Sequence, residues 1–448
     1  MKLSGKKVLV IGLKRTGTAV VRCVAECGGQ VRVTDRQTHA HLVTDLASLA
    51  DIPFDLRLGT EDESLLDGID LVVPSPGVPR TAPLLKAAGR RGIPIWSEIE
   101  LAFRLLSCPI VAVTGTNGKS TTTSLLGEFF RADGNRVFVG GNLGVPLLEA
   151  VGGNYDVAVA EISSFQLEWI EEFHPRIGIW LNLTEDHLDR HGTLADYGAA
   201  KRALFLHQTP AEWAIINRDD SEVARLMIGL PGRQFSFGWS PVACGAWVNA
   251  QEKTLIVKQP DTELRLSLEP LRLHGHHNWE NVMAAVSAAT LWGISREVID
   301  RVLGSFTGLP HRLEWVATKN EVAYFDDSKG TNVGAVVQSL AGFTGPVILL
   351  AGGVDKGGDY GPLREPLRAK VKQLILFGAA REIIKEALAG EADTVVVETL
   401  SEAVRAAAAS ACRGDTVLLS PACASFDQFR NYAHRGEVFR ACVEELWV

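Results

Sequence analysis

Residues 113–122 read Val113-Thr114-Gly115-Thr116-Asn117-Gly118-Lys119-Ser120-Thr121-Thr122. The apolar run 110–113 predicts a β-strand before this turn, and segment 123–130 predicts a helix after it. Backbone N–H groups of such a turn form a cavity for polyphosphate. Lys119 is then placed for the outer phosphates, and the Ser120 or Thr121 hydroxyl for magnesium. Val113 stands where the general pattern has glycine, so a plain strand-to-helix turn is the alternative to a nucleotide-triphosphate site.

Length and composition indicate a globular protein of several domains. The chain has 448 residues, of which 46% are hydrophobic and 22% charged, and at roughly 150 residues per domain it holds about three. The net charge of −8 argues against a nucleic-acid-binding surface. It leaves room for anionic small molecules, because one local cluster of Lys and Arg suffices to bind them.

The cysteines and the chain start indicate a reducing compartment. The seven cysteines are scattered without a C-x-x-C pair, so we expect structural thiols and no zinc site. The first residues lead directly into a short apolar strand, which is not typical of a secretory signal. No run of about 18 apolar residues occurs. We expect a cytoplasmic protein without membrane partners.

The pattern along the chain predicts an α/β protein of three domains: 1–97, 98–306 and 307–448. The first and third regions alternate strand and helix signals, which is typical of Rossmann-like parallel sheets covered by helices. The second is a P-loop-type domain with some antiparallel strands, because 254–258 and 263–273 alternate apolar and polar residues. Strands are predicted at 7–12, 30–35, 71–74, 110–113, 137–139, 157–160, 177–183, 254–258, 263–273, 322–325, 347–351, 374–377, 394–397 and 417–419, and helices at 16–27, 123–130, 278–292, 382–388 and 402–412.

The first strand-to-helix turn is a second candidate nucleotide site. Residues 12–17 read Gly12-Leu13-Lys14-Arg15-Thr16-Gly17, and Asp35 closes the next strand. This resembles a dinucleotide fingerprint without its middle glycine, so a plain βα turn remains an equal alternative. Lys14 and Arg15 favour an anionic ligand, and Asp35 is placed to accept a ribose or uracil hydrogen bond. The turn cluster 75–79 also follows a strand end, where open α/β sheets bind ligands.

Three further residues of the middle region are candidate metal ligands. Glu161 follows a buried strand, where a P-loop-type domain places a magnesium ligand; helix capping is the alternative. His187 lies among acids in Thr184-Glu185-Asp186-His187-Leu188-Asp189, where it is either a metal ligand or a solvated residue. Lys201, taken singly, is an exposed helix lysine.

Two amides and an arginine are candidate nucleotide contacts. Asn278 and Asn281 lie three residues apart at a helix start, so one is a natural N-cap and the other can contact an adenine edge. Arg312, at the second predicted boundary, is either a γ-phosphate clamp or a surface linker residue.

Three polar loops of the third region follow predicted parallel strands. They span 326–332, 352–358 and 420–427 and contribute lysines and hydroxyls. Loops at the same end of one parallel sheet converge on one crevice. Their chemistry suits a small dicarboxylate.

Taken together and in this order, the motifs resemble the Mur ligase family over the whole chain, and within it the branch that adds D-glutamate. The residues that carry the resemblance are 115–121, 141–144, 161–167, 184–189, His277-Asn278 with Asn281, Pro310-His311-Arg312, Asp327-Ser328-Lys329 with Thr331-Asn332, and Ser420-Pro421-Ala422-Cys423-Ala424-Ser425.

The resemblance implies a monomeric ATP-dependent ligase of peptidoglycan synthesis that uses ATP, D-glutamate and UDP-N-acetylmuramoyl-L-alanine, with two magnesium ions. The roles it implies are ATP binding by Gly115, Thr116, Asn117, Gly118, Lys119, Ser120, Thr121, Asn281, Arg312 and Asp327; metal binding by Ser120, Glu161, His187 and a carbamylated Lys201; catalysis by Lys119, His187 and Lys201; UDP-sugar binding by Thr16, Gly17, Asp35, Ser75, Gly77 and Asn142; and D-glutamate binding by Lys329, Thr331, Lys356, Ser425 and Tyr432.

Some features depart from the family, and other functions remain to be compared. Lys14 and Arg15 stand where relatives often carry less charge, and Tyr432 stands where phenylalanine is common. The alternatives are a ligase for another amino acid or for folate, an NAD-dependent dehydrogenase, and a regulatory nucleotide-binding protein. The extended first region argues against the folate ligase, since folate ligases begin close to their phosphate turn.

Overall fold

The computed structural model describes residues 3–271, 273 and 276–446, without the side chains of Asp189 and His276. The chain forms two compact units, one of Met1–Glu269 with Asn281–Leu303 and one of Pro270–Glu280 with Gly304–Val448. The α/β class is confirmed. The predicted three-way division at 97/98 and 306/307 stays a prediction.

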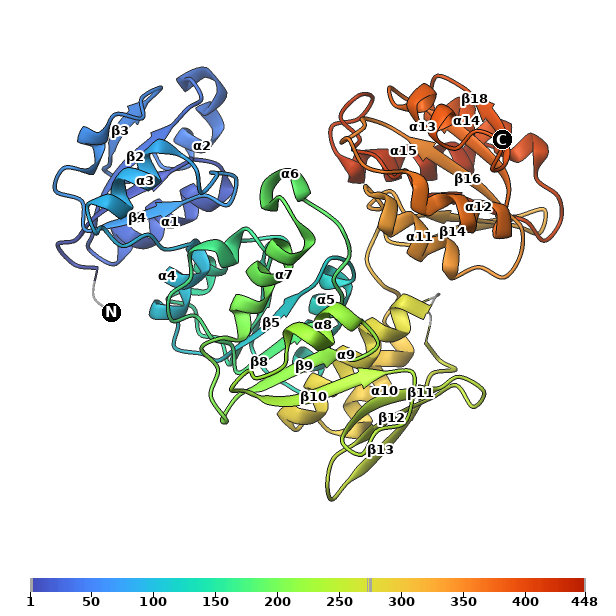
Figure 1. Cartoon of the computed structure of the whole chain (residues 1–448), viewed down its shortest axis with the longest axis horizontal. Helices are drawn as coiled ribbons and strands as arrows, with labels where there is room; N and C mark the ends of the chain where they lie inside the picture. Colours follow the sequence, from blue (N-terminus) through green and yellow to red (C-terminus); the bar gives the residue numbers. More distant parts are fainter. Residues whose placement is uncertain (1–2, 272, 274–275, 447–448) are drawn as a thin grey trace. The chain divides into compact units, whose positions relative to one another are not determined.

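The first unit begins with a parallel four-stranded sheet of order β3-β2-β1-β4 (Figure 1). Successive residues of β1 point to opposite faces. Val8 and Val10 therefore pack with α1, while Leu9 and Ile11 pack with α3. The bounds are β1 Lys7–Ile11, α1 Arg15–Glu26, β2 Gln30–Asp35, η1 His39–His41, α2 Val43–Ala47, β3 Asp55–Leu58, η2 Glu63–Leu66, β4 Leu71–Pro74 and α3 Pro83–Arg90.

The same unit contains a nine-stranded sheet of order β13-β12-β11-β10-β9-β8-β5-β7-β6. Its strands are parallel up to β11, and β12 and β13 are antiparallel, as predicted. The bounds are α4 Glu98–Leu105, β5 Ile110–Thr114, α5 Lys119–Ala132, β6 Val137–Gly141, η3 Leu147–Ala150, β7 Val157–Glu161, η4 Gln166–Trp169, β8 Ile177–Trp180, α6 Leu188–His191, α7 Leu194–Arg202, η5 Ala203–Phe205, β9 Trp213–Asn217, α8 Ser221–Leu226, β10 Arg233–Gly238, β11 Gly245–Asn249, β12 Thr254–Lys258, β13 Glu263–Ser267, α9 His276–Trp292 and α10 Arg296–Ser305.

The second unit has a six-stranded sheet of order β14-β15-β19-β16-β17-β18, parallel except for β14. Alternate residues of β16 separate its two cores: Leu349 packs with α11 and α12, whereas Ile348 and Leu350 pack with α14 and α15. The bounds are β14 Glu314–Lys319, β15 Val322–Asp326, α11 Val333–Ala341, β16 Val347–Gly352, η6 Gly361–Leu363, α12 Arg364–Lys370, β17 Val371–Phe377, α13 Arg381–Ala387, β18 Asp393–Val396, α14 Leu400–Ser410, β19 Thr416–Leu419 and α15 Tyr432–Glu445.

Several element boundaries differ from the sequence-based expectations. The strand predicted at 177–183 ends at Trp180, after which the amide of Leu181 donates to Thr114. The strand predicted at 263–273 ends at Ser267; residue 272 lies outside the described part. Helix α5 begins at Lys119, four residues earlier than predicted. The phosphate-turn hydroxyls therefore lie in its first turn.

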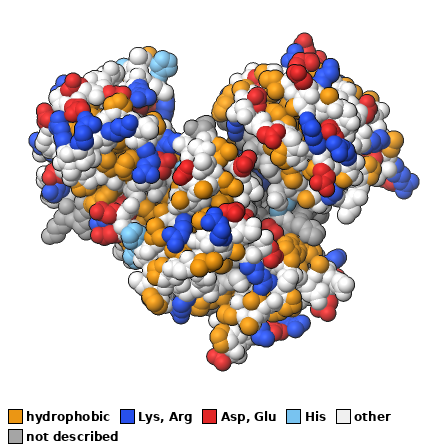
Figure 2. Space-filling view, viewed as in Figure 1, with side chains coloured by type: hydrophobic (Ala, Val, Ile, Leu, Met, Phe, Trp, Pro, Cys, Tyr) orange, Lys and Arg blue, Asp and Glu red, His pale blue; other side chains and the backbone are white. Residues whose placement is uncertain are grey.

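The remaining surface and thiol features agree with the composition. All seven cysteines are free thiols. On the face drawn in Figure 2, acidic and basic side chains are interspersed. None of the described helices has both the length and the apolar character needed to cross a membrane.

Candidate functional site

The glycine-rich turn 115–118, for which we predict phosphate binding, contacts two asparagine side chains from elsewhere in the chain. Asn182 follows β8, and its Oδ1 accepts hydrogen bonds from the amides of Thr116 at 3.0 Å and Asn117 at 2.8 Å. Gly118 has a left-handed φ of 84° and precedes α5. A Cβ on Gly118 would lie 2.1 Å from Oδ1 of Asn281 in α9. Only glycine fits here, because a side chain would be strained by its backbone and would collide with Asn281.

Two lysine amines share one carbonyl of this turn. Lys119 Nζ donates to the Gly115 carbonyl at 2.9 Å and to that of Thr116 at 2.8 Å. Lys201 Nζ, from α7, donates to the same Gly115 carbonyl at 2.9 Å. Lys201 and Gly115 are 86 residues apart in the sequence, so only the fold brings them together. Paired amines at a helix N-terminus suit an anionic phosphate.

Lys201 is not the exposed helix lysine that its residue type alone suggests. It is 1% exposed. Burial, followed by the nearby charge of Lys119, lowers the pKa of Lys201 well below its usual range, while Asp186 and Glu161 act in the opposite direction. A lowered pKa increases the fraction of Lys201 that is present as the neutral amine at a given pH.

Glu161 and Ser120 form a pair of oxygen donors. Glu161 ends β7 and is buried; its Oε2 accepts from Ser120 Oγ at 2.5 Å, and its Oε1 accepts from Asn142 Nδ2 at 2.7 Å. Hard oxygen donors of this kind are the ligands that magnesium prefers. The pair therefore fits a magnesium ion beside the phosphate turn.

His187 and Lys201 both contact Tyr197, a residue to which the sequence assigned no role. The His187 ring lies 4.8 Å from that of Phe165 and 6.5 Å from that of Tyr197. Lys201 Nζ lies 4.4 Å from the Tyr197 ring centroid. His187 also has a left-handed φ of 54° and directly precedes α6. The neighbouring motif residue Asp189 has a side chain outside the described part.

In the first sheet, Asp35 holds a turn. Its Oδ2 accepts from the Leu13 amide at 2.7 Å, and its Oδ1 accepts from the Gln37 amide at 2.8 Å. A Cβ on Gly17 would lie 2.0 Å from the Gly12 carbonyl oxygen, so helix α1 approaches this turn closely. Ser75 Oγ donates to that carbonyl at 2.8 Å. Thus the turn that contains Gly12 and the loop that contains Ser75 meet at the carboxyl end of the sheet, and Thr16 lies in the first turn of α1.

In the second unit, the three predicted loops do follow adjacent parallel strands, β15, β19 and β16. Lys329 Nζ lies 3.9 Å from the Tyr432 ring centroid, and Lys356 Nζ donates to Thr331 Oγ1 at 3.4 Å. Ser425 is 2% exposed. The expected convergence of these loops is therefore observed.

Asp327 links the first of these loops to its surroundings. Its Oδ2 accepts from the hydroxyls of Ser339 and Ser420, each at 2.7 Å. Burial raises the pKa of Asp327 to about 6 despite these bonds. The resemblance had implied ATP binding for this residue, and that role stays a prediction.

Arg435 is the main residue that sequence reasoning missed. This fully buried residue of α15 donates to Ser328 Oγ at 2.9 Å and to the Ser328 carbonyl at 2.8 Å. It also contacts the carbonyls of Cys423 at 3.2 Å and of Gly352 and Ala424 at 3.4 Å. It joins all three loops. A single arginine in a charged helix gives no sequence signal of such burial.

Arg312 lies between two residues with left-handed backbone, His311 with φ 62° and Leu313 with φ 48°. His311 Nδ1 lies 2.7 Å from Asp326 Oδ2, and this hydrogen bond raises the pKa of His311. In the described part of the chain, His311, Asp326 and Glu314 form the one group of His, Cys, Asp or Glu side chains that lie close enough together to hold a metal ion. An ion-pair role is the simpler interpretation here, because acid–histidine pairing already accounts for the arrangement.

Comparison with known proteins agrees with this arrangement. Family models match residues 6–97 (Mur ligase MurD-like, N-terminal domain), 113–289 (Mur ligase middle domain) and 311–423 (Mur ligase, glutamate ligase domain). Together with the relatives described next, they show that this chain belongs to the Mur ligase family, an outcome that confirms the resemblance seen in the sequence.

The particular relatives narrow this class. The chain is 45% identical to the UDP-N-acetylmuramoylalanine--D-glutamate ligase of Geotalea daltonii over 100% of this chain and 99% of the relative. It is 46% identical to the ligase of the same name from Syntrophotalea carbinolica over 99% and 98%. Among solved structures, MurF from Acinetobacter baumannii has a TM-score of 0.63 at 18% identity, covering 99% of this chain and 92% of that one. MurC from Thermotoga maritima has a TM-score of 0.59 at 18% identity, covering 98% and 99%. These structures support the fold alone.

Proposed function

We propose that this chain is an ATP-dependent ligase that joins D-glutamate to UDP-N-acetylmuramoyl-L-alanine and releases ADP and phosphate, in peptidoglycan precursor synthesis. The observation that carries the proposal is the meeting of Lys119 and Lys201 at the Gly115 carbonyl, beside the pair formed by Ser120 and Glu161. The full-length relatives named for this reaction support the choice of substrates.

The reaction proceeds in two transfers. The alanyl carboxylate attacks the γ-phosphoryl group, so that ADP leaves and an acyl phosphate forms. The D-glutamate amine enters as neutral –NH2 and attacks the acyl carbon. The nitrogen of the tetrahedral intermediate then gives one proton to His187 or to a bound water, phosphate is expelled, and the amide forms. Lys119 neutralises charge that gathers on the phosphate oxygens. Magnesium, held by Ser120, Glu161, His187 and a modified Lys201, would supply further positive charge there.

The proposed modification of Lys201 is a carbamate. Its neutral amine adds CO₂ and releases one proton, leaving an anionic oxygen that a hard cation prefers. The lowered pKa of Lys201 supports this step, because only the neutral amine is nucleophilic. The test compares Lys201→Ala with and without short carboxylates. Activity restored by them supports the carbamate, whereas a fully active plain variant contradicts it.

Two further ligand sites belong to the proposal. Thr16, Gly17, Asp35, Ser75, Gly77 and Asn142 bind the UDP-sugar, and Lys329, Thr331, Lys356, Ser425 and Tyr432 bind D-glutamate. Asn281, Arg312 and Asp327 contact ATP. We also propose a monomeric cytoplasmic enzyme that closes about its linkers when substrates bind, which solution scattering with and without substrates can measure.

The deciding experiment measures ATP-dependent phosphate release with UDP-N-acetylmuramoyl-L-alanine and a panel of D- and L-amino acids. Release with D-glutamate that is lost in Lys119→Ala, and kept in the exposed helix control Lys86→Ala, is the expected result. Preference for another amino acid would reassign the substrate. Nicotinamide reduction would favour a dehydrogenase, and nucleotide binding without turnover would favour a regulatory protein.

A further inference from the structure

Arg190, in the short helix α6, reaches from the nine-stranded part of the first unit to the loop after β4. Its Nη2 donates to the carbonyl of Val78 at 2.8 Å and contacts that of Pro76 at 3.4 Å. Both carbonyls belong to the 75–79 turn that contains Ser75 and Gly77, for which we propose UDP-sugar binding. Arg190, which belongs to the part with the nine-stranded sheet, thus binds the backbone of residues 75–79, which follow the four-stranded sheet. We call residues 75–79 the UDP-sugar loop.

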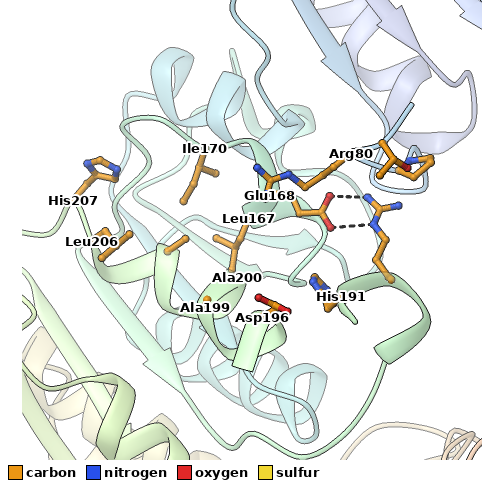
Figure 3. Close-up of a pocket in the computed structure, with 14 residues that line it drawn as sticks. Arg80, Leu167, Glu168, Ile170, His191, Asp196, Ala199, Ala200, Leu206 and His207 are labelled. Atoms are coloured by element: carbon orange, nitrogen blue, oxygen red, sulfur yellow. Dashed lines mark hydrogen bonds and ion pairs between the residues drawn. The ribbon is translucent and has the colours of Figure 1, made fainter. Parts of the chain in front are cut away.

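A carboxylate fixes the orientation of the Arg190 guanidinium. Arg190 Nε and Nη2 donate to the two carboxylate oxygens of Glu168 in η4 at 3.0 and 2.6 Å, a two-point pair (Figure 3). The side chains are 15% and 3% exposed. The Phe165 ring lies beneath, 5.1 Å from the guanidinium carbon. Paired, planar and largely desolvated, this contact is among the stronger ones that arginine makes.

The proposed metal ligand His187 lies directly before the same short helix. His187 directly precedes α6, and the amide of Arg190 donates to the His187 carbonyl at 3.0 Å. The rings of His187 and His191 both pack on Phe165, at 4.8 and 5.5 Å, and His191 Nε2 lies 3.0 Å from Ser164 Oγ. Displacing Arg190 therefore disturbs both the sugar loop and the segment that places His187.

We propose that Arg190, fixed by Glu168, is a positioning residue that couples the UDP-sugar loop to the segment bearing His187. It contacts backbone rather than substrate, so its role is to pre-form the acceptor site. This inference rests on the proposed function. Glu168 is the supporting partner, because its carboxylate leaves the guanidinium a single orientation in which it also reaches the Val78 carbonyl.

A cavity beside this pair makes a specific test possible. The pair lines a cavity of about 500 Å³ together with Arg80, Leu167, Asp196 and Leu206 (Figure 3). Truncating Arg190 to alanine would extend this space to the Val78 carbonyl. A guanidinium ion from solution can then occupy the vacated position, which provides chemical rescue.

The kinetic test uses Arg190→Ala, Arg190→Lys and Glu168→Gln, with Arg104→Ala as matched control. The Arg104 side chain is also 15% exposed and paired with carboxylates, but its ion-pair partners Glu100, Glu171 and Glu172 all lie outside the loop 75–79. We expect Arg190→Ala to raise the KM for UDP-N-acetylmuramoyl-L-alanine roughly 10- to 100-fold, with the KM for ATP within about threefold. Arg190→Lys and Glu168→Gln should give smaller changes, and millimolar guanidinium should partly restore Arg190→Ala alone.

A second readout does not depend on activity. Hydrogen exchange of residues 75–79 should become at least tenfold faster in Arg190→Ala and remain unchanged in Arg104→Ala. Equal changes in the two KM values, or unchanged exchange of this loop in folded Arg190→Ala or Arg190→Lys, would overturn the coupling. A different outcome would refute the proposed function instead: exchange of residues 75–79 is faster in Arg190→Ala, but the wild-type protein neither binds the UDP-sugar nor turns over.

Discussion

Replacing Arg435 by methionine tests whether one buried charge holds together the three loops for which we propose D-glutamate binding. Methionine keeps an unbranched side chain of similar length and removes every donor. The loops that it releases follow β15, β16 and β19. Their mutual contact includes two backbone hydrogen bonds, Val354 amide to Ala424 carbonyl at 2.8 Å and Ala424 amide to Val354 carbonyl at 3.1 Å. The exchange rates of these two amides therefore report on the contact between the loops after β16 and β19.

The expected loss follows from the contacts of Arg435. Its two bonds to Ser328 have normal length, and bonds from a charged donor contribute about 1.5–3 kcal/mol each, or roughly 3–6 kcal/mol together. Burial opposes this, because desolvation lowers the pKa of Arg435 to about 10, which corresponds to a cost of about 3 kcal/mol. The three longer bonds add a smaller contribution. The two Ser328 bonds less the burial cost leave roughly 0–3 kcal/mol. With the longer bonds, we expect a net local loss of about 2 kcal/mol, which speeds exchange roughly 30-fold.

Hydrogen exchange followed by mass spectrometry measures this change without assuming that both units unfold together. The matched control is Arg440→Met on the same helix, where the side chain is 38% exposed and pairs with Glu314 at 2.6 Å. An exposed ion pair contributes about 0–1 kcal/mol. In Arg440→Met, exchange of the Val354 and Ala424 amides should therefore change less than about fivefold. If Val354 and Ala424 exchange equally fast in both variants, the guanidinium is not what joins the loops.

Two other predictions concern the first unit. Burial raises the pKa of Glu98 from 4.5 to about 7. Between these two pH values the folded state therefore keeps a proton that the unfolded chain has released. As a result, the free energy of unfolding falls as pH rises from 4.5 to about 7. Glu98→Gln should therefore gain up to about 3 kcal/mol relative to wild type between pH 5 and pH 8 in thermal unfolding; a pH-independent difference would contradict this. Gly118→Ala should abolish ATP binding in calorimetry, because its Cβ meets Asn281. Gly134→Ala, with φ 88° and open space around it, should cost about 1–2 kcal/mol of stability and leave ATP binding intact; equal loss in both would contradict the steric argument.

The sequence predicted most of the strands because their signal is local. Residues 30–35, 71–74 and 254–258 form strands with the bounds expected from their apolar pattern. Strands β3, β9, β10, β11 and β14 were missed. In a mixed run such as 233–238 the local pattern is weak, and the strand forms through its pairing with β9, 20 residues earlier. The helix start at Lys119 was placed late because threonine and serine there favour turns as readily as helices.

For the site, the sequence alone determined the kind of chemistry: a glycine-rich phosphate turn with Lys119 and Ser120, a carboxylate at a strand end, and lysine-bearing loops after parallel strands. Their residue types and spacing set what they can bind. Only the tertiary structure decided where each side chain points. It buried Lys201 against Gly115, turned Asp327 towards serine hydroxyls, and enclosed Arg435 among carbonyls. These outcomes depend on desolvation and on partners tens of residues away, and neither is written in a local pattern.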